Sequence, residues 1–497
     1  MAKNKIIIVG AGPGGLTAGL LLATKGFDVQ IFEKDNRPGG RNQTLEFDGY
    51  KFDTGPTFLM MKFILDEVFE EAGYRSEDYL KFTRLDPMYR LYFTDNYLDV
   101  YFNHEKLKQE LRRVFPGEEK GVSKFLDKEG RRFKRLFPCL QKDYSAWYGL
   151  FNKSLLKAIP ILGVGRSLYQ VLGSYFSAQE ARLSFTFQSK YLGMSPWECP
   201  GGFAIIPYVE HAFGIYHVEG GLSRISEVMA DLIVRHGGKI HYGKTVKKVL
   251  FRSKDAYGVE LMDGQKVGAD DVIINADFGY AAANLLPTDL VGAYSKEKVA
   301  KKKYSCSTLM FYWGMKKFYK TEHHSVIFAH KYRENVNSIF GGENFTIDDF
   351  SFYVRNSSVS DNTVAPKGKS QFYILVPVPN KQVNAQIDWE QAVPLMKKRI
   401  IGIMEQRLGI KDVAKNIEAE KIVTPNDWVS DYNVFFGATF NLSHKLTQML
   451  YFRPHNRLNG VRNCYLVGGG THPGSGLPTI YESARITTKL ITDKSSK

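Results

Sequence analysis

Cysteine is scarce in this chain. Only four of its 497 residues are cysteines, and no two of them have the Cys-x-x-Cys spacing of zinc sites and redox centres. The adjacent His323 and His324 also lack the spacing of metal ligands. The sequence therefore predicts neither a disulfide framework nor a metal site, and we expect the cysteines to stay reduced in a cytoplasmic protein.

A long hydrophobic segment able to span a bilayer is absent beyond the first 25 residues. Residues 6–24 carry no charge and follow Lys3 and Lys5, which imitates an export signal or a membrane helix. Six of these 19 residues are Gly or Pro, however, and they stand where the apolar part of a signal should be continuous. We therefore expect no export signal, and any membrane role must be peripheral, on one face of the bilayer (monotopic).

Acidic residues are outnumbered by basic ones. The chain has 67 Lys and Arg against 52 Asp and Glu, a formal net charge of +15. This excess favours an anionic partner: nucleic acid, a phospholipid surface or an acidic ligand. No zinc finger, RNA-recognition signature or repeat is present, so we expect no nucleic acid partner. The basic clusters at residues 131–135 and 301–303 are either part of a binding surface or ordinary solvated faces.

The strongest pattern that is present lies at the amino terminus. Residues 5–9 (KIIIV) predict a buried strand, the glycine-rich residues 10–15 (GAGPGG) a turn, and residues 16–25 a packed helix. A second apolar strand over residues 29–32 ends in an acidic residue about twenty positions past the glycines. This order is typical of a dinucleotide-binding unit, in which glycines let the backbone approach a pyrophosphate and the carboxylate binds a ribose. The candidate residues are Gly10, Gly12, Gly14, Gly15 and Glu33.

Two further glycine-rich stretches suit a flavin dinucleotide. Gly39-Gly40-Arg41 follows the second strand and offers a diphosphate a backbone contact and a permanent cation, although the two glycines alone could be a simple turn. Near the carboxyl terminus, residues 463–467 predict a strand that runs into residues 468–478, and a helix follows. Such a loop can set backbone N–H groups against the pyrimidine end of an isoalloxazine. Because both ends of the chain carry nucleotide loops, we expect one cofactor domain interrupted by insertions.

These blocks together resemble the carotenoid desaturase family, the FAD-dependent flavoproteins that oxidise phytoene or dehydrosqualene. That family belongs to a wider group with the amine oxidases and the GDP-dissociation inhibitors. The resemblance implies FAD as cofactor, with Gly40 and Arg41 among the residues that bind it. It also implies that the backbone at Val246 holds adenine. The further cofactor-binding residues that it implies are Gly55, Pro56, Thr57, Gly469, Gly470 and Pro478. The matching blocks are GAGPGG with GGR, DTGPT (53–57), APKGKSQFYILVPVPN (365–380), TPNDW (424–428), FRPHNR (452–457) and GGGTHPGSGLP (468–478).

The expected fold class is α/β: a Rossmann-like FAD-binding domain with an inserted α+β substrate domain and a helical membrane-associating part. Three separate stretches would form the FAD-binding domain, namely residues 1–60, 219–278 and 425–497. A mostly helical region on the substrate side would span residues 61–218, and the sheet of the substrate domain residues 279–424. Within these regions we expect a helix over 222–236, a hairpin over 239–267, and strands over 271–275, 307–313 and 371–378.

The implied activity is the desaturation of an acyclic C30 or C40 carotenoid precursor. Such a polyene has no polar group to recognise, so its binding site must be a long apolar tunnel. Hydride transfer to flavin N5 would make FAD the main catalyst, with a quinone or oxygen as electron acceptor. By the same resemblance Arg166 lies beside the substrate, where it would orient water or a quinone, and Glu210 lies on a helix near the tunnel. The alternatives are a surface arginine and a structural Glu210–His211 pair.

A lipid substrate places the enzyme at the cytoplasmic face of a membrane. Residues 155–176 carry only two charges among apolar and aromatic residues, so this segment would dip into the headgroup region. A buried pair of helices is the alternative for it. Arg131, Arg132, Lys134 and Arg135 would bind anionic lipid beside it.

One departure from the family leaves the substrate open. Many members have small or aliphatic residues where this chain has Tyr481 and Glu482. Glu482 would be a base, a partner of Arg485 or a cap toward solvent. The alternatives to a desaturase are a related polyene oxidoreductase (carotenoid isomerase, oxidase or retinol saturase) and a non-catalytic isoprenoid carrier, and the intact glycine loops argue against the carrier.

Overall fold

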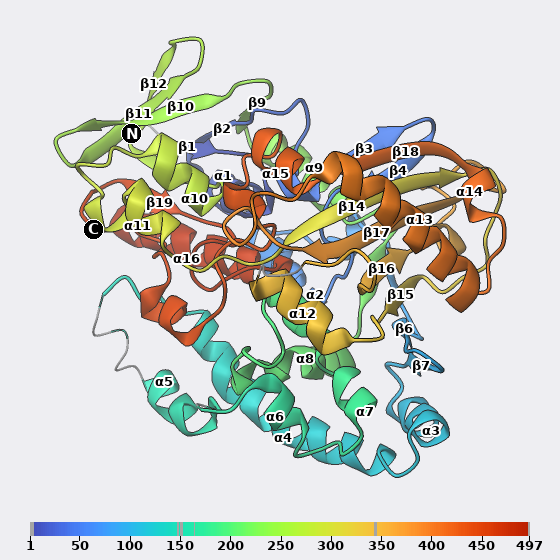
Figure 1. Ribbon diagram of the computed structural model, residues 1–497. Coiled ribbons are helices and arrows are strands. Elements are labelled where there is room, and N and C mark those ends of the chain that lie inside the picture. The colour runs from blue at the N-terminus through green and yellow to red at the C-terminus, as the bar shows by residue number, and fades with distance from the viewer. Residues whose placement is uncertain (1–3, 147–148, 150–152, 164, 342–344, 496–497) are drawn as a thin grey trace.

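A five-stranded parallel sheet forms the centre of the cofactor domain (Figure 1). The computed structural model describes residues 4–495 except 147–148, 150–152, 164 and 342–344. The strand order β19-β13-β1-β2-β9 draws on the three stretches that the sequence assigns to this domain. The α/β, Rossmann-like class is thereby confirmed. The strands are β1 (Lys5–Val9), β2 (Asp28–Phe32), β9 (Lys239–His241), β13 (Asp271–Ile274) and β19 (Cys464–Leu466).

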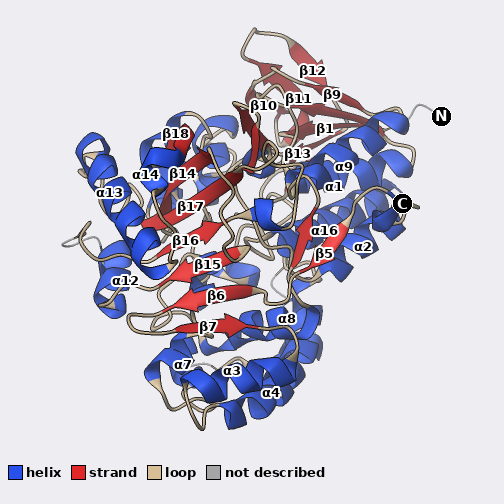
Figure 2. Ribbon diagram, turned by 90° about the vertical axis from the view of Figure 1, so that its right-hand side faces the viewer, coloured by secondary structure: helices blue, strands red, loops and turns tan. Residues whose placement is uncertain are grey.

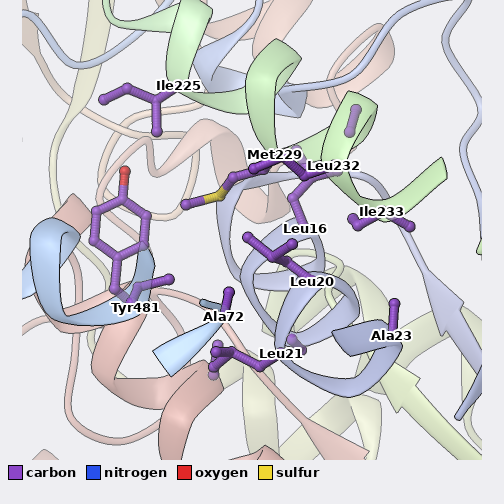
Figure 3. Close-up of a cluster of buried hydrophobic side chains, with 14 of the residues drawn as sticks. Leu16, Leu20, Leu21, Ala23, Ala72, Ile225, Met229, Leu232, Ile233 and Tyr481 are labelled. Carbon is purple, nitrogen blue, oxygen red and sulfur yellow. The ribbon is translucent and has the colours of Figure 1, made fainter. Parts of the chain in front are cut away.

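Both faces of this sheet are covered, which explains its unbroken apolar strands. On one face α1 (Pro13–Thr24) is packed between α9 (Ser223–Arg235) and α16 (Leu477–Ser495), so it is apolar almost all round. Figure 3 shows Leu16 and Leu20 of α1 near Met229 of α9. The other face is covered by β10 (Val246–Arg252), β11 (Asp255–Leu261), β12 (Lys266–Gly268) and the helical turns from α10 (Phe278–Tyr280) to Leu285.

A second sheet, with seven strands in the order β18-β14-β17-β16-β15-β6-β7, forms the centre of the substrate domain (Figure 2). Helix α13 (Trp389–Arg407) covers one face, and the hairpin β3 (Thr44–Phe47) and β4 (Tyr50–Asp53) packs on the other. Its strands are β6 (Tyr89–Tyr92), β7 (Tyr97–Val100), β14 (Ser307–Met315), β15 (His324–Ile327), β16 (Phe352–Arg355), β17 (Ser370–Val378) and β18 (Ile417–Val423).

The region 61–218 is less helical than its sequence suggested. Strands β6 and β7 complete the substrate sheet, and β5 (Phe82–Arg84) pairs with β8 (Tyr216–Val218). All four strands are short, and the pairing of β6 with β15 and of β5 with β8 joins residues far apart in the chain, which leaves no local signal. Helix α2 (Lys62–Glu71) packs on α16 and α1 of the cofactor domain.

The remaining helices of this region gather at the end of the molecule away from β12 (Figure 1). The 22-residue α4 (Glu119–Leu140) is the longest of them and contacts α3, α5 and α8. Among the described residues, none of the helices has both the length and the apolar character needed to cross a membrane. The others are α3 (His104–Val114), α5 (Lys153–Ala158), α6 (Leu168–Leu172), α7 (Gln179–Leu183) and α8 (Ile205–Phe213), and elsewhere α11 (Lys296–Ala300), α12 (Tyr332–Gly341), α14 (Val413–Asn416) and α15 (Pro425–Ser430).

Candidate functional site

The first glycine loop joins β1 to α1 at the carboxyl edge of the parallel sheet. Gly10 has φ +95°, a conformation that side chains other than glycine rarely adopt. A Cβ atom on Gly15 would lie 2.3 Å from the Gly10 carbonyl oxygen, and one on Gly12 would lie 2.9 Å from the Asn275 amide nitrogen. The loop therefore presents bare backbone at the amino terminus of α1, as a pyrophosphate requires.

Asn275, directly after β13, locks this loop in place. Its Nδ2 donates a hydrogen bond of 3.0 Å to the Gly10 carbonyl, and its side chain is 2.8 Å from a Cβ placed on Gly14 or Gly15. In the sequence, residue 275 is only the last position of the expected strand 271–275. Its position could have indicated its role. Because the carboxyl ends of adjacent parallel strands meet at one edge of the sheet, a residue directly after β13 lies next to the glycine loop that follows β1.

Glu33 lies where β2 ends and is 4% exposed. Its two carboxylate oxygens accept hydrogen bonds from the backbone N–H of Ala11 (2.6 Å) and of Asp35 (2.9 Å). Burial raises the pKa of this carboxyl, against the effect of the two hydrogen bonds. Each oxygen keeps a further acceptor site, which suits the hydroxyls of a ribose.

The second glycine stretch lies against the first. The Gly39 N–H donates to the Ala11 carbonyl at 2.8 Å, and a Cβ on Gly40 would be 3.4 Å from Gly12 Cα. Arg41 donates to the Thr439 carbonyl at 2.7 Å, and its charge counters the effect of burial on the pKa of Asp277. The structure thus brings together two loops and the cation that were predicted to hold a diphosphate.

The stretch from Thr54 to Thr57 is held by tyrosines of the substrate sheet. Tyr312 donates to the Thr54 carbonyl (2.9 Å), Tyr373 to the Gly55 carbonyl (2.7 Å) and Tyr353 to Thr57 Oγ1 (2.9 Å). A Cβ on Gly55 would lie 2.2 Å from the Arg41 carbonyl, so Gly55 and the following Pro56 pass directly under the second loop. The candidate cofactor site therefore touches the substrate sheet.

The loop near the carboxyl terminus meets the first glycine loop across the site. A Cβ on Gly14 would be 3.2 Å from Ile480 and 3.4 Å from the Gly468 nitrogen. Gly469 accepts a hydrogen bond from Arg453, and a Cβ on Gly470 would collide with Asn441 and Phe278 at 2.5 Å. Pro478 is buried in the first turn of α16, whose unpaired N–H groups open toward the loop. Val246, the adenine contact implied by the resemblance, begins β10 and shares a cluster with Phe32 of β2.

This cradle fits FAD. It has tightly packed glycines, two helix amino termini, a cation and a buried carboxylate after the second strand, which are the groups that a flavin dinucleotide uses. The model for the family described as flavin containing amine oxidoreductase matches residues 13–492. The 4,4'-diapophytoene desaturase (4,4'-diapolycopene-forming) of a Methylomonas species is 50% identical over 495 residues, covering 99% of this chain and 96% of the relative. The chain belongs to the flavin-containing amine oxidoreductases, among the carotenoid desaturases.

Other similarities agree with this membership. A zeta-carotene-forming phytoene desaturase of Myxococcus xanthus is 36% identical, with 98% of this chain and 94% of the relative covered. A solved oxidoreductase structure from Methanosarcina mazei shares the fold with a TM-score of 0.64 at 17% identity, over 98% of this chain and all of that one. The desaturase is therefore an FAD-dependent oxidoreductase, and the prediction of an enzyme with an FAD cofactor is confirmed.

Glu210, a predicted catalytic residue, is completely buried on α8. One carboxylate oxygen accepts hydrogen bonds from the Tyr89 hydroxyl (3.0 Å) and the Gln188 amide (2.7 Å), while the other has no hydrogen-bond partner among the described residues. Burial raises the pKa of Glu210 to about 8. Glu210 and His211 are not hydrogen-bonded to each other, and the His211 ring contacts the rings of Phe125 and Phe185. A structural role for the two residues stays a prediction.

Tyr89 connects Glu210 to the edge of the cofactor site. Its ring is 6.2 Å from that of Phe58, which follows Thr57 directly. Phe58 also contacts His324, and His324 is hydrogen-bonded to the same Tyr353 hydroxyl that holds Thr57. A catalytic role for Glu210 stays a prediction, and the structure gives it a route of contacts to the cofactor loops.

Arg166 lies at the surface, where it donates to the Gln170 carbonyl at 2.7 Å. With Arg182 it lines an open hollow of about 580 Å³. No hydrogen bond, ion pair or ring contact of the described residues joins Arg166 to either glycine loop. A role for Arg166 beside the substrate remains a prediction. Its position at the surface agrees with the alternative of a surface arginine.

Glu482 pairs with Arg485 at 2.8 Å, which is one of the three alternatives that the sequence left open. Arg485 also binds Glu67 and Glu71 of α2, and Gln141 donates to Glu482. Neighbouring Tyr481 is buried in the core between α1, α9 and α16 (Figure 3). Both residues thus tie α16 to its neighbours.

Proposed function

We propose that the protein introduces conjugated double bonds into an acyclic C30 carotenoid precursor, 4,4'-diapophytoene. The observation that carries this proposal is the 50% identity, over almost the whole chain, with a relative named for that substrate, compared with 36% for one named for phytoene. An acyclic polyene offers no polar group, so its recognition depends on apolar walls. The aromatic cluster that includes Tyr89, Phe93 and Phe187 next to Phe58 supplies walls of this kind.

The chain's own residues bind and orient, and bound FAD supplies the two-electron oxidation of the carbon chain. The glycine loops and Glu33 would hold the dinucleotide, and three tyrosine hydroxyls of the substrate sheet fix the segment 54–57 beside them. Glu210 is our candidate for the group that takes up the proton, and it does so only in its ionised form, which becomes the main form above its raised pKa of about 8 and is there a stronger base than an ordinary carboxylate. The electron acceptor in this proposal is a quinone or oxygen.

The test is a product assay with purified, FAD-loaded protein on liposomes carrying either 4,4'-diapophytoene or phytoene. Chromatography with absorbance detection should give a coloured polyene from the C30 substrate. Colour from phytoene alone would move the assignment to C40. Unchanged lipid in both samples, with FAD still bound, would refute a desaturase of acyclic precursors and favour a related polyene oxidoreductase.

Peripheral binding to the cytoplasmic face of a membrane is the second part of the proposal. Helix α5 and the loop 446–452 pack through one apolar cluster, and together they leave three large apolar side chains in solvent, one from the helix and two from the loop. Leu156 is 50% exposed, Leu446 43% and Phe452 58%. Lys153 and Lys157 flank Leu156 and add positive charge. Such a patch suits the headgroup region of an anionic bilayer.

Fewer residues are exposed to solvent, and so available to contact lipid, than the sequence suggested. Leu155, Leu168 and Leu172 of the segment 155–176 are buried, so only part of this segment faces solvent, and Val164 lies outside the described residues. Arg132 is also buried, where it pairs with Glu129 and donates to the Ile161 carbonyl. The basic side chains of that cluster that reach solvent are Arg131, Lys134 and Arg135.

Sedimentation with anionic liposomes tests the patch. Replacing Leu156 and Phe452 by Ser should reduce the bound fraction several-fold, and high salt should weaken binding of the unchanged protein. Met262→Ser, in the turn between β11 and β12 at the opposite end of the molecule in Figure 1, is the matched control, because it removes a 65% exposed apolar side chain away from the patch. Equal binding by the double variant and the control would contradict this surface.

A further inference from the structure

Arg453 is fully enclosed by the protein, and its charge is not paired with an acidic side chain in the part of the chain that the structure describes. It follows the short helical turn Leu450–Phe452 and is 1% exposed. No carboxylate among the described residues forms an ion pair with it. Its guanidinium instead donates to five backbone carbonyls, those of Gly469 (2.6 Å), Thr471 (3.1 Å), Gln448 (3.3 Å), Leu442 (3.4 Å) and Ser443 (3.5 Å).

The groups around Arg453 do not cancel its charge. Burial lowers the pKa of His472 to about 3 and that of His444 well below its ordinary value, so both rings are neutral at pH 7. Burial also lowers the pKa of Arg453, to about 9, which still leaves it charged. Lys302, the other basic group nearby, has its pKa lowered by burial and by Arg453. This part of the protein therefore holds an uncompensated positive charge away from water, an arrangement that costs free energy.

The position of Arg453 indicates what this charge does. Two of the five carbonyls, those of Gly469 and Thr471, belong to the glycine loop that opens α16. The guanidinium thus lies directly behind the loop that the sequence assigns to the pyrimidine end of the isoalloxazine. Reduction of a flavin adds negative charge to that end of the ring system. A nearby cation stabilises this charge strongly where water does not screen it.

We propose that Arg453 is a positioning residue whose buried charge makes the bound flavin easier to reduce. The desaturase needs a strongly oxidising flavin because its substrate offers only carbon–hydrogen bonds to oxidise. The proposal rests on FAD in the cradle and not on which polyene is the substrate. It differs from a purely structural role, in which Arg453 would only fasten the loop 442–448 to the loop 468–474.

Gln448 separates the two roles, because it fastens the same loop with a neutral side chain. Its amide donates to the carbonyls of Lys303 and Ser443, and its carbonyl oxygen accepts from the Lys303 N–H. Gln448→Met therefore loosens the loop without changing the charge. Arg453→Met removes both the charge and the hydrogen bonds that hold the two loops together. Arg453→Lys keeps the charge but loses most of the hydrogen bonds that the guanidinium donates.

The experiment measures the two-electron midpoint potential of bound FAD by equilibration with a reference dye, together with the affinity of the oxidised flavin for sulfite. Neither measurement needs the substrate, so failure of the proposed function leaves this test intact. Arg453→Met should lower the equilibrium constant for reduction of the bound flavin at least tenfold, which corresponds to a midpoint potential lower by about 30 mV for two electrons. It should weaken sulfite binding by a similar factor. Arg453→Lys should keep most of both properties. Gln448→Met should lower the melting temperature but leave the potential unchanged.

Two results would overturn the proposal: an unchanged potential in Arg453→Met, or an equal fall in Arg453→Met and Gln448→Met. If Arg453→Met does not fold, Gln448→Glu provides the comparison. It places a carboxylate in the loop that the guanidinium holds and leaves Arg453 present. A lower potential in Gln448→Glu than in Gln448→Met supports the role of charge, and equal potentials refute it.

Discussion

Replacing Arg355 by Met should destabilise the protein more than any surface substitution, because this arginine neutralises the centre of a buried charge network. Arg355 at the end of β16 donates to Asp53 at 2.6 Å and contacts His217 at 3.1 Å. His217 in turn is 2.8 Å from Asp361. All four side chains are at most 3% exposed, and none of this network was foreseen from the sequence.

The size of the effect follows from what Asp53 keeps after the change. Without Arg355 its carboxylate retains a hydrogen bond from the Ser223 N–H but has no charge partner. Breaking a buried ion pair from one side costs about 3–5 kcal/mol of unfolding free energy. The double variant Asp53→Asn, Arg355→Met removes both charges, so its loss should be smaller than the sum of the single losses by about 1–3 kcal/mol.

Urea unfolding followed by circular dichroism and by the release of flavin fluorescence measures these losses. Arg462→Gln is the control, since it breaks an exposed pair with Asp255 and should not shift the urea midpoint measurably. Asp53 leads into the segment 54–57, so Arg355→Met should also retain less FAD after gel filtration. A midpoint for Arg355→Met equal to that of the control would refute this account of the network.

Three further predictions address the cofactor site, pH and α16. Gly15→Val should abolish FAD retention in gel filtration, because a Cβ would lie 2.3 Å from the Gly10 carbonyl, whereas Gly402→Ala, with nothing within 4 Å, should bind FAD normally. Glu210 binds a proton in the folded state up to a pKa of about 8, so its contribution to stability should be lost as pH rises from about 4.3 to 8, by up to about 1.4 kcal/mol per pH unit; Glu210→Gln should lack this slope in urea unfolding at several pH values, and equal slopes would disprove it. Arg485→Gln leaves the buried Glu482 without its cation and should lower the unfolding free energy by about 3 kcal/mol, more than Glu67→Gln does, as thermal unfolding of both variants would show.

Local motifs made the cofactor half of the site predictable. The turn after β1 requires glycine because of its φ angle and close backbone contacts, and Glu33 stands at a fixed distance from it, so both are visible in a short stretch of sequence. Asn275 and Arg453 were missed as site residues for a different reason. Asn275 acts on Gly10, which is 265 positions away, so no local pattern pointed to it. Arg453 stands in the block FRPHNR, but only the folded loop shows that its side chain reaches the carbonyls of Gly469 and Thr471.

The region 61–218 shows the same limit in the fold. The pattern of its sequence predicted a mostly helical region, and α4 agrees with that prediction. Strands β6 and β7 are each four residues long and pair with each other, and β6 joins them to the substrate sheet by pairing with β15, more than 200 residues later. Likewise, Arg132 in a basic cluster is buried against Glu129, although its neighbours reach solvent. Sequence spacing could not separate these cases, since burial depends on which elements pack together.

The sequence by itself determined the cofactor, because a nucleotide loop is built from a few consecutive residues whose backbone must be bare and tightly turned. It also determined the family, through blocks that occur in a fixed order along the whole chain. Only the tertiary structure decided which charges are compensated. It pairs Asp53 with Arg355, 302 positions away, and it selects Arg485 from the three alternatives that the sequence left open for Glu482. It also leaves Arg453 enclosed with no acidic partner among the described residues. Charge compensation is a property of distance and burial, and both arise only when distant segments of the chain meet.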